Sequence, residues 1–325
     1  MSPAVAELLE DRGEAASGEE FFRSTQFLEA EGVTHTLRVA SDDRELVAPL
    51  VVREIGNGPD LDAISPYGYP GIAPATSAAS FDPPGAGSKR AAPLDPADID
   101  FSATGLVAIF LRHALEDPPL RGASERNVVQ IADPGLPRKS RGSDRNQINK
   151  NLRHGYELSL VPGPRTSDAE RAGFLSAYEQ TMRRTGAAER YFFGRAYFER
   201  ILEFPRTWLA IARAPDGIEA AASIVAVSDG YLHYYLSGSA DSHLRDSPMK
   251  NVVASLVQLA TELRLPLNLG GGISRGDRLE EFKRGFANRE LSWSTSEIVA
   301  DPEAYARLSA GRDASGFFPV YRAPS

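Results

Sequence analysis

The sequence predicts a mixed α/β (α+β) protein in which hairpin-linked, mostly antiparallel strands pack against helices. Apolar residues alternate along segments joined by Asp216–Gly217 and Asp229–Gly230, and Asp-Gly between such segments favours a β-hairpin. In 168–186 and 249–263 the apolar residues recur at helical spacing instead. Hairpin strands followed by a helix and one more strand are typical of a mixed sheet flanked by helices, not of a doubly wound sheet.

The second half of the chain gives the clearest series of elements. A glycine ends the first of its helices, and turn residues separate its strands. We predict helices at 143–155, 168–186, 194–204 and 249–263 and from Asp277, with strands at 156–164 and 267–269 and three more within 206–240.

The first half shows a shorter version of the same order, which predicts a duplicated architecture. A length of 325 residues suits two domains of about 150 residues each, and we expect them at 1–150 and 151–325. A stretch at 65–96 is rich in Pro, Gly, Ala and Ser and is expected to be a loop. The other elements expected here are helices at 21–30 and 106–115 and strands at 34–41, 45–55 and 127–131.

Composition excludes several classes of function. The chain has no cysteine, which rules out disulfides, thiolate zinc sites and cysteine nucleophiles, and its five histidines have no metal-ligand spacing, so no metal is expected. A net charge of −8 argues against a general nucleic-acid binder, and we expect no DNA partner. The sequence shows neither a signal peptide nor an apolar run of about 18 residues, which predicts a cytoplasmic protein without a membrane partner.

The most informative segment runs from Asn268 to Phe286. Gly270, Gly271 and Gly272 follow a short apolar strand, and they allow positive φ and close approach of the backbone to a ligand or another segment. A tight turn before an ordinary amphipathic helix explains the same residues.

The helix after these glycines carries charge at its edge. Asp277 occupies the N-cap position, and Lys283 and Arg284 are expected at the edge of the apolar face. A glycine turn followed by such a cation is suited to holding an anion or a developing oxyanion. The apolar face itself is predicted to consist of Leu279, Phe282 and Phe286.

The order of elements fits an N-acyltransferase of the GNAT type. Acetyl-CoA-using members hold the pyrophosphate with a glycine-containing loop at the start of a helix. The equivalent junction here, 244–251, has no glycine, and Pro248 removes one N–H donor. We therefore expect an acyl donor other than acetyl-CoA. Lys250 either contacts a phosphate or is a solvated lysine on the surface.

Short motifs extend the resemblance over nearly the whole chain. They are SPYGYPG (65–71), RNQINKNLRHGYEL (145–158), YEQTMRR (178–184) with YFF (191–193) and YF (197–198), YYLSGS (234–239), LGGG (269–272) with FKRGF (282–286), and FFPVYR (317–322). In this order the motifs resemble the Fem-type (FemABX) aminoacyltransferases and related GNAT-like proteins.

The resemblance implies two tandem GNAT-like domains with an acceptor cleft at or between them. It also implies transfer of an aminoacyl group from aminoacyl-tRNA onto an amine, as in peptidoglycan bridge synthesis and tRNA-dependent steps of natural-product (antibiotic) pathways. The chain lacks the coiled-coil insertion of some bridge-forming members, which favours a small, diffusible acceptor.

The implied chemistry requires no cofactor. An aminoacyl ester is already activated, so the protein needs to position an amine, accept its proton and stabilise an oxyanion. The resemblance to the family's FK motif implies that Lys283 contacts the oxyanion or the terminal ribose. Asp277 accepts a proton, orients the attacking amine or merely caps its helix, and Tyr234 is the third catalytic candidate.

Aromatic residues complete the expected substrate site. Tyr234 and Tyr235 end a strand, so one of them should face the core and the other the cleft. Exposed aromatics in an irregular loop often mark a binding surface. The expected substrate-binding residues are Tyr67, Tyr69, Tyr235, Gly270, Gly271, Gly272 and Phe282.

A basic segment is the candidate contact with the acceptor end of tRNA. A local cluster of cations on an acidic protein can bind the end of a nucleic acid, and a solvated helix face accounts for it equally well. The candidate cations are Arg138, Lys139, Arg141, Arg145, Lys150 and Arg153, with Lys250 and Arg284 elsewhere.

Two other functions fit the same sequence. One is an acyltransferase of the same fold that uses an acyl-CoA or acyl-carrier donor, against which the missing glycine loop counts. The other is a non-catalytic GNAT-like binding protein, for which Lys283 would be dispensable.

Overall fold

A computed structural model describes residues 3–75, 92–116, 120–312 and 316–323. The chain forms two compact units, one of Met1–Arg126 with Ser292–Ser325 and the other of Asn127–Leu291. The expected boundary at residue 150 therefore moves to residue 126, and the chain re-enters the first unit at residue 292. Both crossings fall inside long strands, β8 (Ser124–Ala132) and β14 (Arg289–Val299), where composition gives no linker signal.

The first unit is a mixed sheet with strand order β6-β1-β2-β3-β4-β7-β14, to which β5 adds beside β3. Among its described strands, only β1–β6 and β4–β7 pair in parallel. Its elements are β1 (Ala4–Leu9), α1 (Thr25–Ala30), β2 (His35–Ala40), β3 (Glu45–Glu54), β4 (Leu61–Ile64), β5 (Ala73–Pro74), β6 (Ile99–Asp100), β7 (Leu106–Arg112), the end of β14, and α7 (Pro302–Ser309).

One predicted helix of this unit, 106–115, is wrong. Residues Leu106–Arg112 form β7, paired with β4 on one side and β14 on the other. A short apolar run such as LVAIFLR fits a strand buried on both faces as well as a helix, and periodicity does not separate the two. Of the predicted loop 65–96, residues 73–74 form β5 and residues 76–91 lie outside the described ranges.

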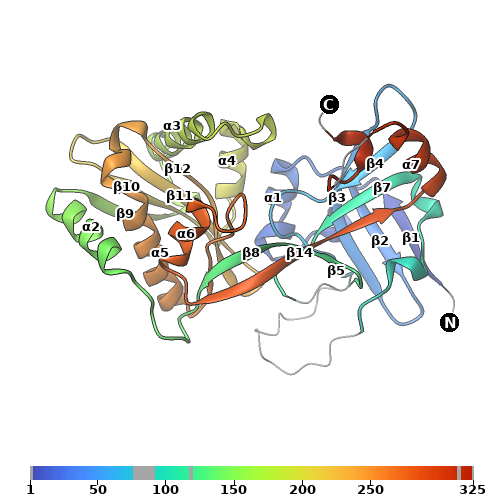
Figure 1. The fold of residues 1–325 in the computed structure, drawn as a ribbon, viewed down its shortest axis with the longest axis horizontal. Helices are drawn as coiled ribbons and strands as arrows, with labels where there is room; N and C mark the ends of the chain where they lie inside the picture. Colours follow the sequence, from blue (N-terminus) through green and yellow to red (C-terminus); the bar gives the residue numbers. More distant parts are fainter. Residues whose placement is uncertain (1–2, 76–91, 117–119, 313–315, 324–325) are drawn as a thin grey trace. The chain divides into compact units, whose positions relative to one another are not determined.

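The second unit confirms the order of elements predicted for it (Figure 1). Its strand order is β8-β13-β12-β11-β10-β9, antiparallel except for β12 and β13. The elements are α2 (Gly142–Arg153), β9 (Glu157–Pro162), α3 (Asp168–Arg184), α4 (Arg195–Leu202), β10 (Thr207–Arg213), β11 (Glu219–Ser228), β12 (Tyr231–Ser239), α5 (Met249–Leu263), β13 (Leu267–Asn268) and α6 (Arg278–Arg284).

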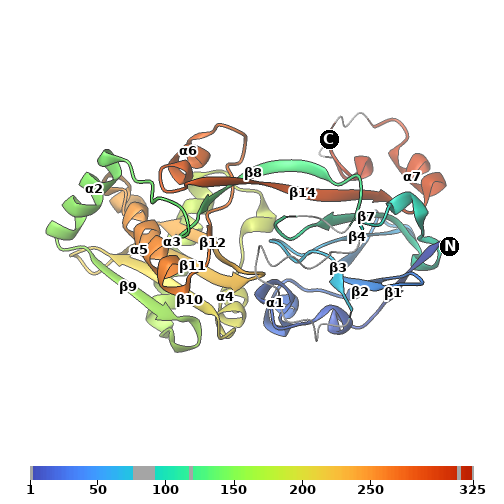
Figure 2. The same cartoon turned by 90° about the horizontal axis from the view of Figure 1, so that it is seen from below.

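Helices cover both faces of this second sheet (Figure 2). Helix α5 packs its buried face, which includes Val252 and Leu256, with the sheet residues Val225 and Leu232. Helices α3 and α4 enclose an aromatic cluster on the other face. Across the described ranges, we find no helix with the length and apolarity needed to span a bilayer.

The middle of this sheet opens where two parallel strands part. Strands β12 and β13 pair only through Leu232 with Leu267 and His233 with Asn268. One residue later the register against β11 shifts, from Val225 opposite Tyr234 to Ile224 opposite Leu236, which is a β-bulge. The early parting of the strands opens a wedge between β12 and the segment after Asn268, and the glycine segment begins there.

Gly238 is expected to be essential for packing α3 onto β12. A Cβ atom at this position would lie 2.4 Å from the carbonyl carbon of Ala177 and from the nitrogen of Tyr178, both rigid backbone atoms. We expect Gly238→Ala to lower the free energy of unfolding by about 1–3 kcal/mol. Gly142→Ala, which meets only the flexible end of Arg145, is the control. Equal urea midpoints for the two variants would contradict the assignment.

Candidate active site

The glycine segment lies directly after β13. Only Gly270 adopts the predicted positive φ, at 73°. The other two glycines are required by close approach instead. A Cβ at Gly271 would lie 2.7 Å from the side-chain nitrogen of Asn127, and one at Gly272 would lie 2.4 Å from an oxygen of Asp277.

The carbonyl groups of this segment are occupied. The Gly270 carbonyl accepts from Gln130 N (3.1 Å), the Gly271 carbonyl from Lys283 Nζ (2.7 Å), and the Gly272 carbonyl from Asn127 Nδ2 (2.9 Å).

Two amides of the segment are available to a ligand. The N–H groups of Gly271 and Gly272 donate to no group within the described ranges. In a trans peptide the N–H and the preceding C=O point in opposite directions. Because the Gly270 carbonyl points to β8, the Gly271 N–H points to the opposite edge, where β12 diverges.

Helix α6 buries polar residues where an apolar face was predicted. Glu280 is 1% exposed and Lys283 is 8% exposed, whereas Leu279 is 41% exposed. The prediction that Lys283 lies at the helix edge is therefore wrong. Phe286 is buried as expected, and the half-buried Phe282 packs edge-on to it at 5.6 Å. Burial of a lysine and a glutamate on one short helix needs specific partners, because unpaired buried charge is costly.

Lys283 has two such partners. Its Nζ donates to the Gly271 carbonyl at 2.7 Å and lies 5.8 Å from the centre of the Tyr234 ring, a cation–π geometry. Burial lowers the pKa of Lys283 to about 8, although the nearby Asp277 carboxylate raises it slightly. Lys283 therefore titrates near neutral pH.

Tyr234 forms the wall of the wedge opposite the glycines. Its hydroxyl donates to Ser237 Oγ at 2.6 Å, and burial raises its pKa to about 12. A phenol with this pKa stays protonated at neutral pH. Tyr234 can therefore orient Lys283 through its ring, but it is a poor base.

Asp277 shapes the loop between the glycines and α6. One carboxylate oxygen accepts the Glu280 N–H at 2.7 Å, as the predicted N-cap, and the other accepts from Ile273 N (2.6 Å) and Ser274 N (3.0 Å). These backbone hydrogen bonds lower the pKa of Asp277. Because a carboxylate stabilised in this way is a weak base, we assign Asp277 to loop geometry, not to proton transfer.

The remaining tyrosine candidates lie away from Lys283 or in the other unit. Tyr235 turns to the opposite face of the sheet, where its hydroxyl bonds that of Tyr197 at 2.7 Å. Tyr69 is half-buried in the first unit, packed against Phe22 at 5.5 Å and Trp293 at 5.8 Å, so it is not the exposed aromatic that was expected. Tyr67 is also half-buried, and its N–H donates to Glu31.

Three of the predicted tRNA-binding cations have acidic partners. Lys250 Nζ pairs with Asp144 at 2.9 Å, Arg284 with Glu280 and Glu290, and Arg141 with Glu281 at 3.6 Å. Lys250 and Arg284 therefore join elements of the second unit, which makes them poor phosphate ligands. Asp144 is distant in the chain from Lys250 and gave no sequence signal, whereas the i, i+4 spacing of Glu280 and Arg284 was a usable one.

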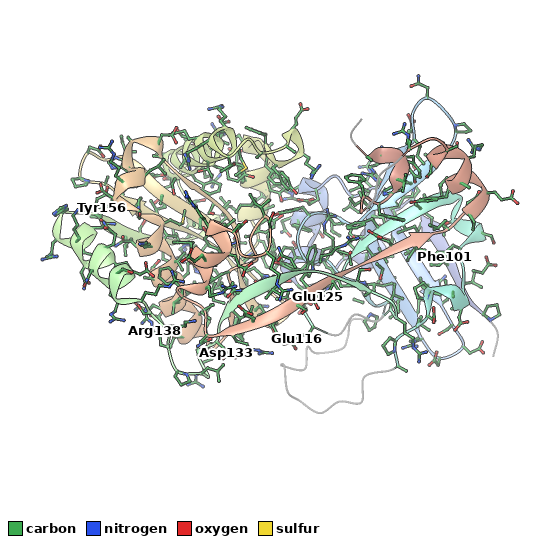
Figure 3. The ribbon with its side chains drawn as sticks, in the orientation of Figure 1. Phe101, Glu116, Glu125, Asp133, Arg138 and Tyr156 are labelled. Atoms are coloured by element: carbon green, nitrogen blue, oxygen red, sulfur yellow. The ribbon has the colours of Figure 1, made fainter. Side chains whose placement is uncertain are left out.

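The other five cations form an exposed basic surface on α2 and the segment before it, where Figure 3 labels Arg138. None of the five has an ion pair within the described ranges. The same helix lines a surface hollow with Asn146, Asn149, Leu152 and Arg153. The five are Arg138, Lys139, Arg145, Lys150 and Arg153.

The junction before α5 is closed by the protein itself. The Asp246 carbonyl accepts from Asn151 Nδ2 (2.8 Å) and Gln147 Nε2 (3.0 Å), and its carboxylate accepts the Tyr156 hydroxyl (2.8 Å).

Three amides at the start of α5 are also committed. Lys250 N donates to the Ser247 carbonyl, and Asn251 N and Val252 N both donate to the Pro248 carbonyl. The Met249 N–H has no partner in the described ranges, and Arg245 is exposed, but most of the backbone donors that a pyrophosphate needs are already bonded.

Sequence reasoning missed two residues of the site. Glu280 accepts the Gly276 N–H at 2.7 Å, and Asn127 holds Gly272 from β8. An acid three residues after the N-cap Asp277 was a usable signal for Glu280. Asn127 lies far away in sequence, and only the sheet brings it to the glycines.

Comparison with known proteins gives a class for this arrangement. Residues 138–284 match the model of the acetyltransferase (GNAT) domain. No curated protein sequence is significantly similar to the chain. Similar solved structures are FemX (TM-score 0.57, 11% identity, 92% of this chain and 97% of that one) and L-PGS from Bacillus licheniformis (0.55, 13%, 84% and 86%). The C-terminal domain of a putative lysylphosphatidylglycerol synthetase from Agrobacterium fabrum is also similar (0.56, 14%, 91% and 93%).

Residues 138–284, which make up most of the second unit, therefore match a GNAT acetyltransferase domain, and the chain shares its fold with the three solved structures. The predicted mixed α/β fold class with two tandem GNAT-like domains is confirmed, and the likeness in fold to FemX agrees with the ordered motifs.

Burial of Lys283 should reduce stability in a pH-dependent way. Its folded-state pKa of about 8 lies below the ordinary 10.5, so between these values the unfolded chain binds more protons and wild-type stability rises with pH. We expect Lys283→Met to be more stable than wild type by about 1–3 kcal/mol at pH 7, with the gain shrinking above pH 8.

Urea unfolding at pH 7 and pH 9.5 measures this effect. Lys139→Met, at an exposed position, should change stability little at either pH. A Lys283→Met variant that is less stable at pH 7, or that has the same difference at both pH values, would show that the buried ammonium costs nothing.

Proposed function

We propose that this protein is an aminoacyltransferase that moves an aminoacyl group from aminoacyl-tRNA to the amine of a small acceptor, forming an amide. The observation that carries the proposal is the closed junction before α5, where Asp246 and bonded amides occupy the position at which GNAT enzymes hold CoA phosphates. A donor without that pyrophosphate fits this chain better.

The basic surface of α2 supports a polyanionic donor. Its five cations have no acidic partner among the described residues, although the chain carries a net charge of −8. Arg141 also donates to the Glu281 carbonyl at 3.2 Å, so the start of α2 contacts the helix that carries Lys283. A tRNA end bound along α2 would therefore have its terminus near the wedge.

The wedge supplies what aminolysis of an ester requires. The acceptor nitrogen attacks the ester carbonyl carbon, a C–N bond forms, and the C–O bond to the terminal ribose breaks. Lys283 Nζ and the free Gly271 N–H are suited to stabilise the oxyanion that develops between these steps. The proton lost by the amine leaves with the ribose oxygen. With a pKa of about 8, Lys283 can relay it.

The similar structures point to the same class of acyl group. Lysylphosphatidylglycerol synthetase is named for a product that contains an aminoacyl group, and FemX shares the Fem-type fold. For this chain we propose a free amine of a natural-product intermediate, as in antibiotic biosynthesis, or of a peptidoglycan precursor, and a cytoplasmic site of action.

A donor test separates this proposal from acyl-CoA chemistry. Purified protein is incubated with an amine pool and either radiolabelled aminoacyl-tRNA or labelled acyl-CoA. We expect amide product only with aminoacyl-tRNA, and none after RNase treatment. Lys283→Met should lower kcat/KM by about 100-fold or more, because it removes charge stabilisation of the transition state.

Arg206→Met is the control, because Arg206 is exposed and lies outside the site. RNase-resistant product that requires the CoA thioester would contradict the proposal. Full activity of Lys283→Met would instead favour a binding protein or a different catalytic group.

The cations of α2 are expected to control affinity for tRNA. In a plot of log K against log salt concentration, removal of one cation that pairs with a phosphate should reduce the magnitude of the slope by about 0.9. We expect Arg145→Ala with Arg153→Ala to weaken tRNA binding and to reduce this slope by about 2. Exposed Arg165 and Arg206, replaced by Ala in the same unit, are the control. A slope equal to that of wild type would exclude α2 as the phosphate-binding surface.

A further inference from the structure

The loop of residues 271–277, here called the Ile273 loop, presents an isoleucine to solvent beside Lys283. Ile273 is 83% exposed, more than any other large apolar residue of the described chain. It follows Gly271 by two residues, so its Cα lies within about 7 Å of that of the residue whose carbonyl holds Lys283 Nζ.

The loop is fixed in shape, which excludes disorder as the reason for this exposure. Asn127 holds Gly272, Asp277 holds the amides of Ile273 and Ser274, and Glu280 holds that of Gly276. A loop fixed at this many points loses little entropy when a ligand binds.

Two cations follow the isoleucine in the chain. Arg275 and Arg278 are both exposed, and neither forms an ion pair within the described ranges. An apolar side chain close in the chain to two such guanidinium groups complements a ligand that combines a flat apolar part with negative charge. An unstacked nucleotide within a single strand has this character.

The Ile273 loop lies near the basic surface of α2. Helix α6 connects the loop to that surface, and its seven residues span about 10 Å. Arg141 donates to the Glu281 carbonyl, and a Cβ at Gly285 would lie 3.5 Å from Arg141 Nε, so the basic surface of α2 begins near the C-terminal end of α6. The Ile273 loop precedes the N-terminal end of the same helix.

We propose that the Ile273 loop binds the single-stranded 3′ end of the donor tRNA. The terminal base packs on Ile273, Arg275 and Arg278 pair with the adjoining phosphates, and the aminoacyl ester is thereby placed at Lys283. This inference rests on the proposed function, because it specifies how that donor is held.

Binding of two RNA hairpins to the full-length protein tests the inference. Both carry the same acceptor-stem duplex, and only one has a single-stranded CCA 3′ end. For wild type we expect the overhang to increase affinity about 5- to 100-fold. Ile273→Ala, and separately Arg275→Ala with Arg278→Ala, should remove most of that increase and leave affinity for the blunt hairpin unchanged.

Two comparisons make the test specific. Ser274→Ala, in the same loop, should keep the full effect of the overhang, and Arg145→Ala with Arg153→Ala should weaken both hairpins equally. An overhang effect that is absent in wild type, or unchanged in Ile273→Ala, would overturn the inference. Failure of wild type to bind either hairpin, with product formed only from acyl-CoA, would overturn the proposed function itself.

Discussion

The hydrogen bond from Lys283 Nζ to the Gly271 carbonyl is the interaction on which the rest of the site depends. It holds the ammonium group of a lysine that is only 8% exposed. The carbonyl is available because β12 and β13 part after two paired residues. A wider pairing of these strands would bond the glycine backbone to β12 and close the wedge.

The second unit combines this open wedge with a closed junction, and the two features differ in the donors that they leave for an anion. At the wedge the Gly271 N–H, which has no partner in the described chain, lies near the Lys283 ammonium, whereas at the junction the oxygens of Asp246 and three amides of α5 already have partners. An anion is therefore favoured at the first position over the second. This contrast supports the proposed function, in which the wedge stabilises charge that develops at an ester.

The sequence predicted the elements of the second unit well because hairpin turns and long amphipathic helices are local signals. It failed at 106–115, where an apolar run lacks a distinguishing period, and at the unit boundary, which lies within continuous strands. At the site it identified the glycines and Lys283 but placed Lys283 at the surface. Its burial depends on the Gly271 carbonyl and the Tyr234 ring, which only tertiary structure brings to α6.

The choice of lysine at this position has a chemical reason. In the proposed reaction arginine would keep its charge throughout, whereas burial brings the pKa of lysine to about 8 and suits it both to hold an oxyanion and to release a proton. Glycine at 270 suits this arrangement, since its φ is positive and a Cβ there would lie 3.2 Å from Nζ. Glycine at 270 and lysine at 283 therefore go together. The glycine admits the ammonium to the wedge, and the wedge sets its pKa.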